Sequence, residues 1–266
     1  MTTTALGYLP DLTDPRDWDF NKAAISGNDL TLVEKIDWRP RVVEILDQGY
    51  LGSCVSQGAM GAIRLKNVFN GVKNPKLGNR LHVYAGARSY IKTLNEDSGS
   101  HIRDAFRFIN KVGFMPEDET DNQHDLKKYQ ELPTPREMRL MFDQRDTGEK
   151  VDYYRITGRG EDRVLSLKQA MGLGNVPVLG TQTTEDFLQY KSGVLSKPDD
   201  KAELTGGHAF YLAGFTPSYV IGVNSWGPDW GMEGFFYMSW DYVKWPSTQD
   251  IWVVNKAPYF SHLRAA

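Results

Sequence analysis

The stretch Asp47-Gln-Gly-Tyr-Leu-Gly-Ser-Cys-Val-Ser-Gln57 places the one cysteine of the chain, Cys54, directly before a helical pattern. Small and apolar residues recur at helical spacing from Cys54 to Phe69, and the pattern stops at Asn70-Gly71, a typical helix end. We therefore predict a helix whose first turn carries Cys54. The positive end of the helix dipole and a neighbouring imidazolium would lower the pKa of that thiol. Taken alone, however, a single cysteine is most often a small buried hydrophobe.

The composition is that of a folded globular protein. Of 266 residues, 40% are hydrophobic and 24% charged, and the charges that sum to -3 are interspersed, which predicts no nucleic-acid partner. No apolar run reaches the roughly 18 residues that cross a bilayer, and the first residues lack signal-peptide features. We expect a soluble protein without a membrane partner, cytoplasmic or exported without a conventional signal. One cysteine excludes a disulfide within the chain and a multi-cysteine zinc site, and we expect neither a metal nor a cofactor.

The chain divides into a helix-rich first half and a strand-rich second half. Residues 1 to about 36 are predicted to form an extended arm, because prolines and aspartates interrupt any periodicity. Further helices are predicted over about 81–94, 101–111 and 137–143. From residue 151 onward, short apolar runs bounded by Gly, Pro or Asp predict strands beginning near Val176, Ala209, Tyr219 and Gly234. The pattern predicts an α+β fold with a cleft between two lobes.

A thiol that attacks an amide needs a general base, a residue that orients this base and a hydrogen-bond donor to the oxyanion. The sequence offers one candidate for each. His208, in Gly206-Gly-His-Ala209, begins a predicted buried strand and is the candidate general base. Asn224 is the candidate that orients the imidazole, and Gln48, six residues before Cys54 (54 − 48 = 6), is the candidate donor to an oxyanion. Each has an alternative reading, respectively a core histidine, a turn asparagine and a surface glutamine.

Together, Asp47-Gln48-Gly49, Gly52-Ser53-Cys54, Gly207-His208-Ala209 and Asn224-Ser225-Trp226-Gly227 resemble the papain family of cysteine peptidases in order and spacing. The resemblance implies a two-lobe fold, with a helical lobe over about 37–150 and a β-barrel-like antiparallel lobe over about 151–260. It implies Cys54 as nucleophile, His208 as base and later acid, Asn224 as orienting residue and Gln48 as oxyanion donor. Trp226 matches the indole that shields the imidazole.

The same resemblance suggests a set of substrate-binding residues: Gly99, Ser100, Thr181, Gly207, Ala209 and Trp226. Gly99 and Ser100 would pair with an extended peptide backbone, and the small residues Thr181 and Ala209 would line the main side-chain pocket. The sequence departs from the family at Leu51, a common position of a disulfide cysteine, and at Val55, where an aromatic residue is common. These departures indicate a disulfide-free member of bacterial or viral type.

The expected function is a cysteine endopeptidase that hydrolyses peptide or protein substrates through a thioester acyl-enzyme. Two alternatives use the same residues differently: an acyl transferase in which an amine intercepts the thioester, and a non-catalytic binding or assembly protein that keeps the fold. The resemblance spans roughly residues 37 to 240, within a predicted peptidase domain over 37–266. Residues 1–36 are too short for the long helical pro-domain of many relatives. We hypothesise that this arm lies over the cleft as a short autoinhibitory pro-segment.

Overall fold

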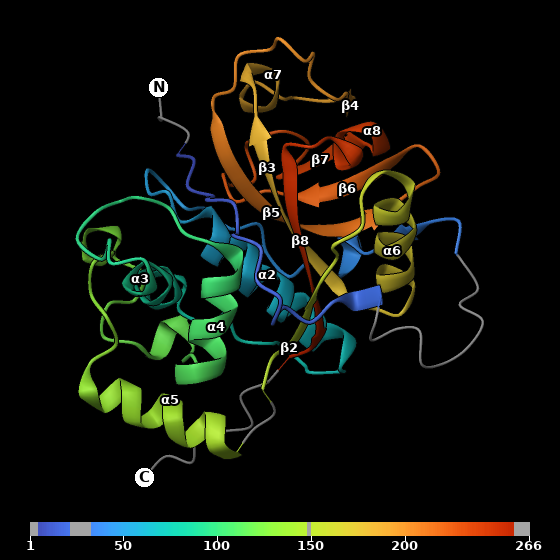
Figure 1. Ribbon diagram of the computed structural model, residues 1–266. Coiled ribbons are helices and arrows are strands. Elements are labelled where there is room, and N and C mark those ends of the chain that lie inside the picture. Colours follow the sequence, from blue (N-terminus) through green and yellow to red (C-terminus); the bar gives the residue numbers. More distant parts are fainter. Residues whose placement is uncertain (1–4, 22–32, 148–149, 258–266) are drawn as a thin grey trace.

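The computed structural model describes residues 5–21, 33–147 and 150–257. Parts of the predicted arm, residues 1–4 and 22–32, therefore lie outside the described residues. None of the helices within the described ranges has both the length and the apolar composition needed to cross a membrane. The described chain forms a helical lobe and a sheet lobe, as expected for an α+β protein (Figure 1).

The helical lobe consists of four helices: α2 (Cys54–Phe69), α3 (Arg80–Tyr90), α4 (Ile102–Val112) and α5 (Pro135–Thr147). The short 3-10 helices η1 (Arg39–Arg41), η2 (Glu117–Glu119) and η3 (Leu126–Lys128) lie in its connections. Helix α3 begins after Asn79, whose side chain accepts a hydrogen bond from the backbone N–H of His82. Helix α4 ends before Gly113, which has a φ of 96° that favours glycine. All four helices were predicted, although α5 is longer than the expected 137–143.

The second lobe is built on an eight-stranded sheet. Its strands follow the order β2-β8-β3-β5-β6-β7-β4, with β1 paired to β5 off this path. All pairings are antiparallel except that of β4 with β7. Within the described residues the path stays open, so the sheet is not closed into a barrel. The bounds are β1 Ile36–Asp37, β2 Asp152–Arg155, β3 Val176–Thr183, β4 Val194–Leu195, β5 Gly206–Phe215, β6 Tyr219–Val223, β7 Phe235–Ser239 and β8 Thr248–Lys256, with helices α6 (Gly160–Gly172), α7 (Glu185–Leu188) and α8 (Trp240–Lys244).

The two faces of the sheet bury different cores. Alternate residues of β3 and β8, such as Val178 and Trp252, pack with α2 and α4 in the core between the lobes. Their neighbours Leu179 and Ile251 point the other way, into a core that includes residues of α6 and α8. This period of two is the pattern expected for strands covered on both faces. Helix α2 is buried along nearly its whole length because it lies between the other helices of its lobe and the sheet.

The N-terminal arm passes between the two lobes as an extended segment (Figure 1). The backbone N–H groups of Gly7 and Tyr8 donate to the carbonyl of Gly207, at 3.1 and 3.0 Å. On the other side, the N–H of Ser100 donates to the carbonyl of Gly7, and the N–H of Leu9 donates to the carbonyl of Ser100. The arm is therefore not draped over the outer surface. It adds a short strand-like segment between the helical lobe and β5.

Candidate active site

Cys54 is the first residue of α2, as predicted. The helix packs closely on β5 because two of its residues lack side chains there. A Cβ atom at Gly58 would lie 3.5 Å from the backbone of Phe210, and one at Gly61 would lie 2.5 Å from the ring of Tyr211. This close packing brings the N-terminal end of α2 toward the first residues of β5, where His208 lies.

His208 and Asn224 form the hydrogen bond that their predicted roles would require. The Nε2 atom of His208 lies 2.7 Å from the Oδ1 atom of Asn224, and both residues are buried. The backbone N–H of Ser225 also donates to Oδ1, at 2.8 Å, which fixes the orientation of the amide. Among the described residues, no hydrogen-bond partner contacts the Nδ1 atom of His208. The imidazole is thus held through one nitrogen while the other remains available.

Trp226 covers the imidazole. The ring centroids of Trp226 and His208 are 4.5 Å apart at an interplanar angle of 33°. Phe187 contacts the imidazole edge-on with its centroid 5.6 Å away. Because these aromatic rings keep water from the His208–Asn224 hydrogen bond, the bond is stronger than it would be in solvent.

Gln48 is buried and oriented by three hydrogen bonds. Its Oε1 atom accepts from the hydroxyl of Ser225 at 2.6 Å, and its Nε2 atom donates to the carbonyl of Leu51 at 2.7 Å. The second hydrogen of Nε2 points to the carbonyl of Ala5 in the arm, at 3.0 Å. An arm carbonyl therefore occupies the donor that was predicted to bind an oxyanion.

The arm seals the site from solvent. Cys54 and His208 are both 0% exposed. Burial raises the pKa of the Cys54 thiol to about 12, although nearby backbone N–H groups, including that of Gly7, favour the thiolate. Burial also lowers the pKa of His208 to about 4, against the opposing effect of the Asn224 hydrogen bond. The expected lowering of the thiol pKa is thus not found while the arm is in place, because desolvation outweighs the helix dipole.

Most of the predicted substrate-binding residues contact the arm. Ser100 and Gly207 bond to its backbone, and a Cβ atom at Gly99 would lie 2.2 Å from the carbonyl oxygen of Gly7. Ala209 lies beside Gly180 in the sheet, in the same buried core as Tyr8 of the arm. Thr181 is an exception among the predicted substrate-binding residues, because its side chain points away from the arm. Its hydroxyl is 2.9 Å from that of Thr248, on the sheet face opposite to Gly180.

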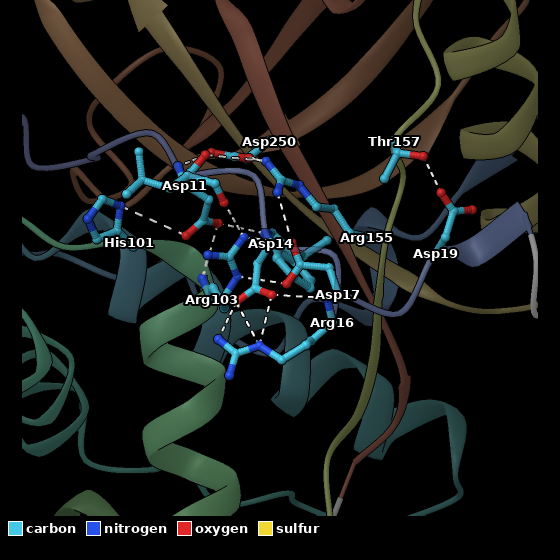
Figure 2. Close-up of polar contacts among 12 residues, drawn as sticks. Asp11, Asp14, Arg16, Asp17, Asp19, His101, Arg103, Arg155, Thr157 and Asp250 are labelled. Carbon is cyan, nitrogen blue, oxygen red and sulfur yellow. Dashed lines mark hydrogen bonds and ion pairs between the residues drawn. The ribbon is translucent and has the colours of Figure 1, made fainter.

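Carboxylates and guanidinium groups fasten the next part of the arm (Figure 2). The cluster consists of Asp11, Asp17, Arg103, Arg155 and Asp250. Arg103 donates to both carboxylate oxygens of Asp17, at 2.8 and 2.6 Å, and Arg155 donates to Asp17 at 2.9 Å and to Asp250. Buried ion pairs of this kind hold two segments in one geometry, and removal of one partner leaves an uncompensated charge.

Sequence reasoning missed three residues of the site, namely Ser225, Tyr8 and Asp250. Ser225 stands inside a motif that was used for Asn224 and Trp226, and a hydroxyl beside an orienting asparagine was the signal available. Tyr8 and Asp250 are 242 positions apart and meet through a hydrogen bond from the phenol to the carboxylate. No local pattern indicates such a pair.

Comparison with known proteins gives matches in both sequence and structure. The sequence profile described as "Papain family cysteine protease" matches residues 32–250. An uncharacterised peptidase C1-like protein of Acanthamoeba polyphaga mimivirus is 29% identical over 94% of this chain and 86% of its own length. Procathepsin L of Felis catus is 25% identical over 80% of this chain, which spans 62% of that protein. The crystal structure of xylellain, a cysteine protease from Xylella fastidiosa, superposes on this chain with a TM-score of 0.79 and 25% sequence identity. The match covers 96% of this chain and 97% of the xylellain chain.

Proposed function

Because the chain belongs to the papain family of cysteine proteases, we propose that it is an endopeptidase with Cys54 as nucleophile, His208 as general base, Asn224 as orienting residue and Gln48 as oxyanion donor. The observation that carries this assignment is the buried hydrogen bond of 2.7 Å between His208 and Asn224. It engages Nε2 and leaves Nδ1 available to exchange a proton with a thiol. A base held by a third group is the arrangement that activates a nucleophile.

The reaction proceeds in two balanced steps. Once the arm has left, the Cys54 thiolate attacks the peptide carbonyl carbon. The backbone N–H of Cys54 and the Gln48 Nε2 hydrogen released from Ala5 bind the oxyanion. The C–N bond breaks as protonated His208 gives its proton to the departing amine, which leaves a thioester. Water then attacks the thioester while His208 accepts its proton, the C–S bond breaks and the acid product leaves. Both steps use only these side chains, the backbone N–H of Cys54 and water.

With the arm docked in the cleft, the proposed enzyme is inactive. With the arm in place, the thiol and the imidazole are buried, and the pKa shifts keep both neutral near pH 7. The carbonyl of Ala5 occupies the hydrogen of Gln48 that the oxyanion needs. We therefore assign residues 1–36 as an inhibitory pro-segment that has to leave the cleft before a substrate enters.

One substitution is expected to open the cleft within the full chain. A Cβ atom at Gly7 would lie 1.8 Å from the carbonyl oxygen of Gly52, a contact that no side-chain rotation relieves. We therefore expect Gly7→Ala to displace the arm from Cys54 while all other residues stay unchanged. We call Gly7→Ala the open variant.

Covalent labelling tests the proposed function directly. The open variant is treated with an epoxide inactivator of cysteine peptidases and analysed by mass spectrometry, with the same variant carrying Cys54→Ala as control. We expect one label per chain at Cys54, none in the control, and cleavage of a denatured protein substrate by the unlabelled open variant. Intact, unlabelled Cys54 together with no cleavage would favour a binding or assembly role. Peptide products carrying an added amine in place of a free acid would favour the acyl transferase.

Ser225 is expected to act through Gln48. Loss of its hydroxyl in Ser225→Ala frees Oε1 of Gln48, so the amide no longer presents its hydrogen in a fixed direction. In the open variant we expect kcat to fall about 10-fold with little change in KM, whereas Gln48→Ala should cost about 100-fold or more. A double-mutant cycle provides the control, because Ser225→Ala should add almost nothing once Gln48 is already alanine. Additive losses would show that Ser225 acts independently of Gln48.

A further inference from the structure

The side chain of Tyr8 fills a pocket in the sheet face beside the candidate site. Three neighbouring strands provide a row of directly paired residues beneath it: Ala209 of β5, Gly180 of β3 and Asp250 of β8. A Cβ atom at Gly180 would lie 2.2 Å from the Tyr8 ring, so the absence of a side chain makes room for an aromatic ring. Tyr8 is only 3% exposed.

A carboxylate closes the end of this pocket. The phenol of Tyr8 donates a hydrogen bond to Oδ2 of Asp250, whose side chain is fully buried. The backbone N–H of Asp11 donates to the same oxygen at 2.7 Å, while Arg155 donates to Oδ1 (Figure 2). When the arm departs, Oδ2 loses both of its donors, and the ion pair with Arg155 remains. An emptied pocket then presents one buried acceptor whose charge is already balanced.

The backbone contacts of the arm lead a substrate to this same pocket. Tyr8 is flanked by the two bonds that Gly7 and Leu9 make to Ser100, and both Gly7 and Tyr8 donate to Gly207. These backbone groups are open to any extended peptide once the arm has left. A substrate residue that pairs with Ser100 therefore places its side chain over Gly180 and toward Asp250.

We propose that this pocket selects tyrosine in the substrate, with Asp250 as the specificity-determining residue. The inference rests on the proposed peptidase function and names its substrate class. A phenylalanine fills the same volume but leaves Oδ2 without a donor, and an unsatisfied buried acceptor is costly. Lysine and arginine gain little, because Arg155 already neutralises Asp250. Leucine loses both the hydrogen bond and contact with the far end of the pocket.

The test uses a full-length variant with Gly7→Ala and Tyr8→Ala, which opens the cleft and removes the native occupant of the pocket. Matched peptides vary each residue on the amino side of the scissile bond among tyrosine, phenylalanine, leucine and arginine. At one position we expect kcat/KM for tyrosine to exceed that for phenylalanine by about 10- to 100-fold. Asp250→Asn, which keeps the shape of the side chain, should reduce this ratio to a few-fold.

A binding experiment separates the pocket from the chemistry. The same variant with Cys54→Ala is titrated by calorimetry with a peptide of residues 1–21 that carries either tyrosine or phenylalanine at position 8. We expect the tyrosine peptide to bind about 10- to 100-fold more tightly. Equal binding of the two peptides, equal cleavage of the tyrosine and phenylalanine substrates, or a preference for arginine would overturn the inference. Tyrosine-selective binding without any hydrolysis would support the pocket and count against the proposed peptidase.

Discussion

His208→Ala in the open variant is expected to lower kcat/KM for peptide hydrolysis by about 1,000-fold or more. Without the imidazole, no group takes the proton of the thiol, and none returns it to the departing amine. The loss should fall mainly on kcat, because His208 is buried behind Trp226 and contributes little area for binding a ground-state substrate. Initial rates over a range of substrate concentrations separate the two constants.

The matched control is His101→Ala, also in the open variant. The Nδ1 atom of His101 lies 3.1 Å from the carbonyl of Leu9 in the arm, and its ring contacts neither Asn224 nor Trp226 in the described part of the chain. Its loss should therefore change kcat/KM by less than about 3-fold, within the range of surface substitutions. If His208→Ala kept hydrolysis within about 10-fold of the open variant, His208 could not be the general base.

Asn224→Ala should have a smaller effect than His208→Ala. The imidazole would remain, held by its contacts with Trp226 and Phe187, but Nε2 would lose its partner. This graded order follows from the proposed roles of the two residues, since a general base takes part in proton transfer and an orienting residue acts only through the base.

Local sequence patterns predicted the helical lobe well. Helix α2 begins at Cys54 as expected, because its small and apolar residues repeat with helical spacing up to the Asn70-Gly71 stop. Helix α6 and strand β8 were not predicted. In α6 the buried residues include Arg163 and Ser166 as well as apolar ones, which obscures the helical period. In β8 the apolar run 251–254 does not alternate with polar residues, because both faces of the strand are buried. Tertiary packing determines these elements more than local propensity does.

The sequence motifs predict which residues could form the site, but not how the arm covers them. The motifs around Gln48, Cys54, His208 and Asn224 indicate the groups that an amide-cleaving thiol needs. They do not indicate that a carbonyl of the arm occupies Gln48, or that burial raises the pKa of the thiol to about 12. Nor do they indicate that Gly180, rather than Thr181, lies on the sheet face that the Tyr8 ring covers, because a shift of one residue along a strand reverses the face. Such facts depend on contacts between segments far apart in the sequence.

Gly7→Ala itself is expected to raise the rate at which Cys54 is alkylated by about 100-fold or more relative to the unmodified chain. The added methyl group would lie 1.8 Å from the carbonyl oxygen and 2.5 Å from the Cα atom of Gly52. Gly52 cannot move aside easily, because its N–H donates to Asp97 and it is joined through Ser53 to the first turn of α2. The arm must therefore yield, and each 1.4 kcal/mol that the docked state loses raises the open population about tenfold.

Two comparisons make this result decisive. Leu12→Ala is the matched control within the arm, because the Leu12 side chain is 79% exposed and its loss should leave the alkylation rate unchanged. Gly99→Ala would also collide with the arm, but Gly99 has a φ of 76°, so strain in the substrate-binding segment would confuse the result. Gly7 does not have a positive φ, and its substitution therefore acts through the collision alone. Thermal unfolding of the variant checks that the two lobes remain folded. An unchanged alkylation rate in a folded Gly7→Ala protein would mean that the arm does not limit access to Cys54, and inhibition by the pro-segment would have to be abandoned.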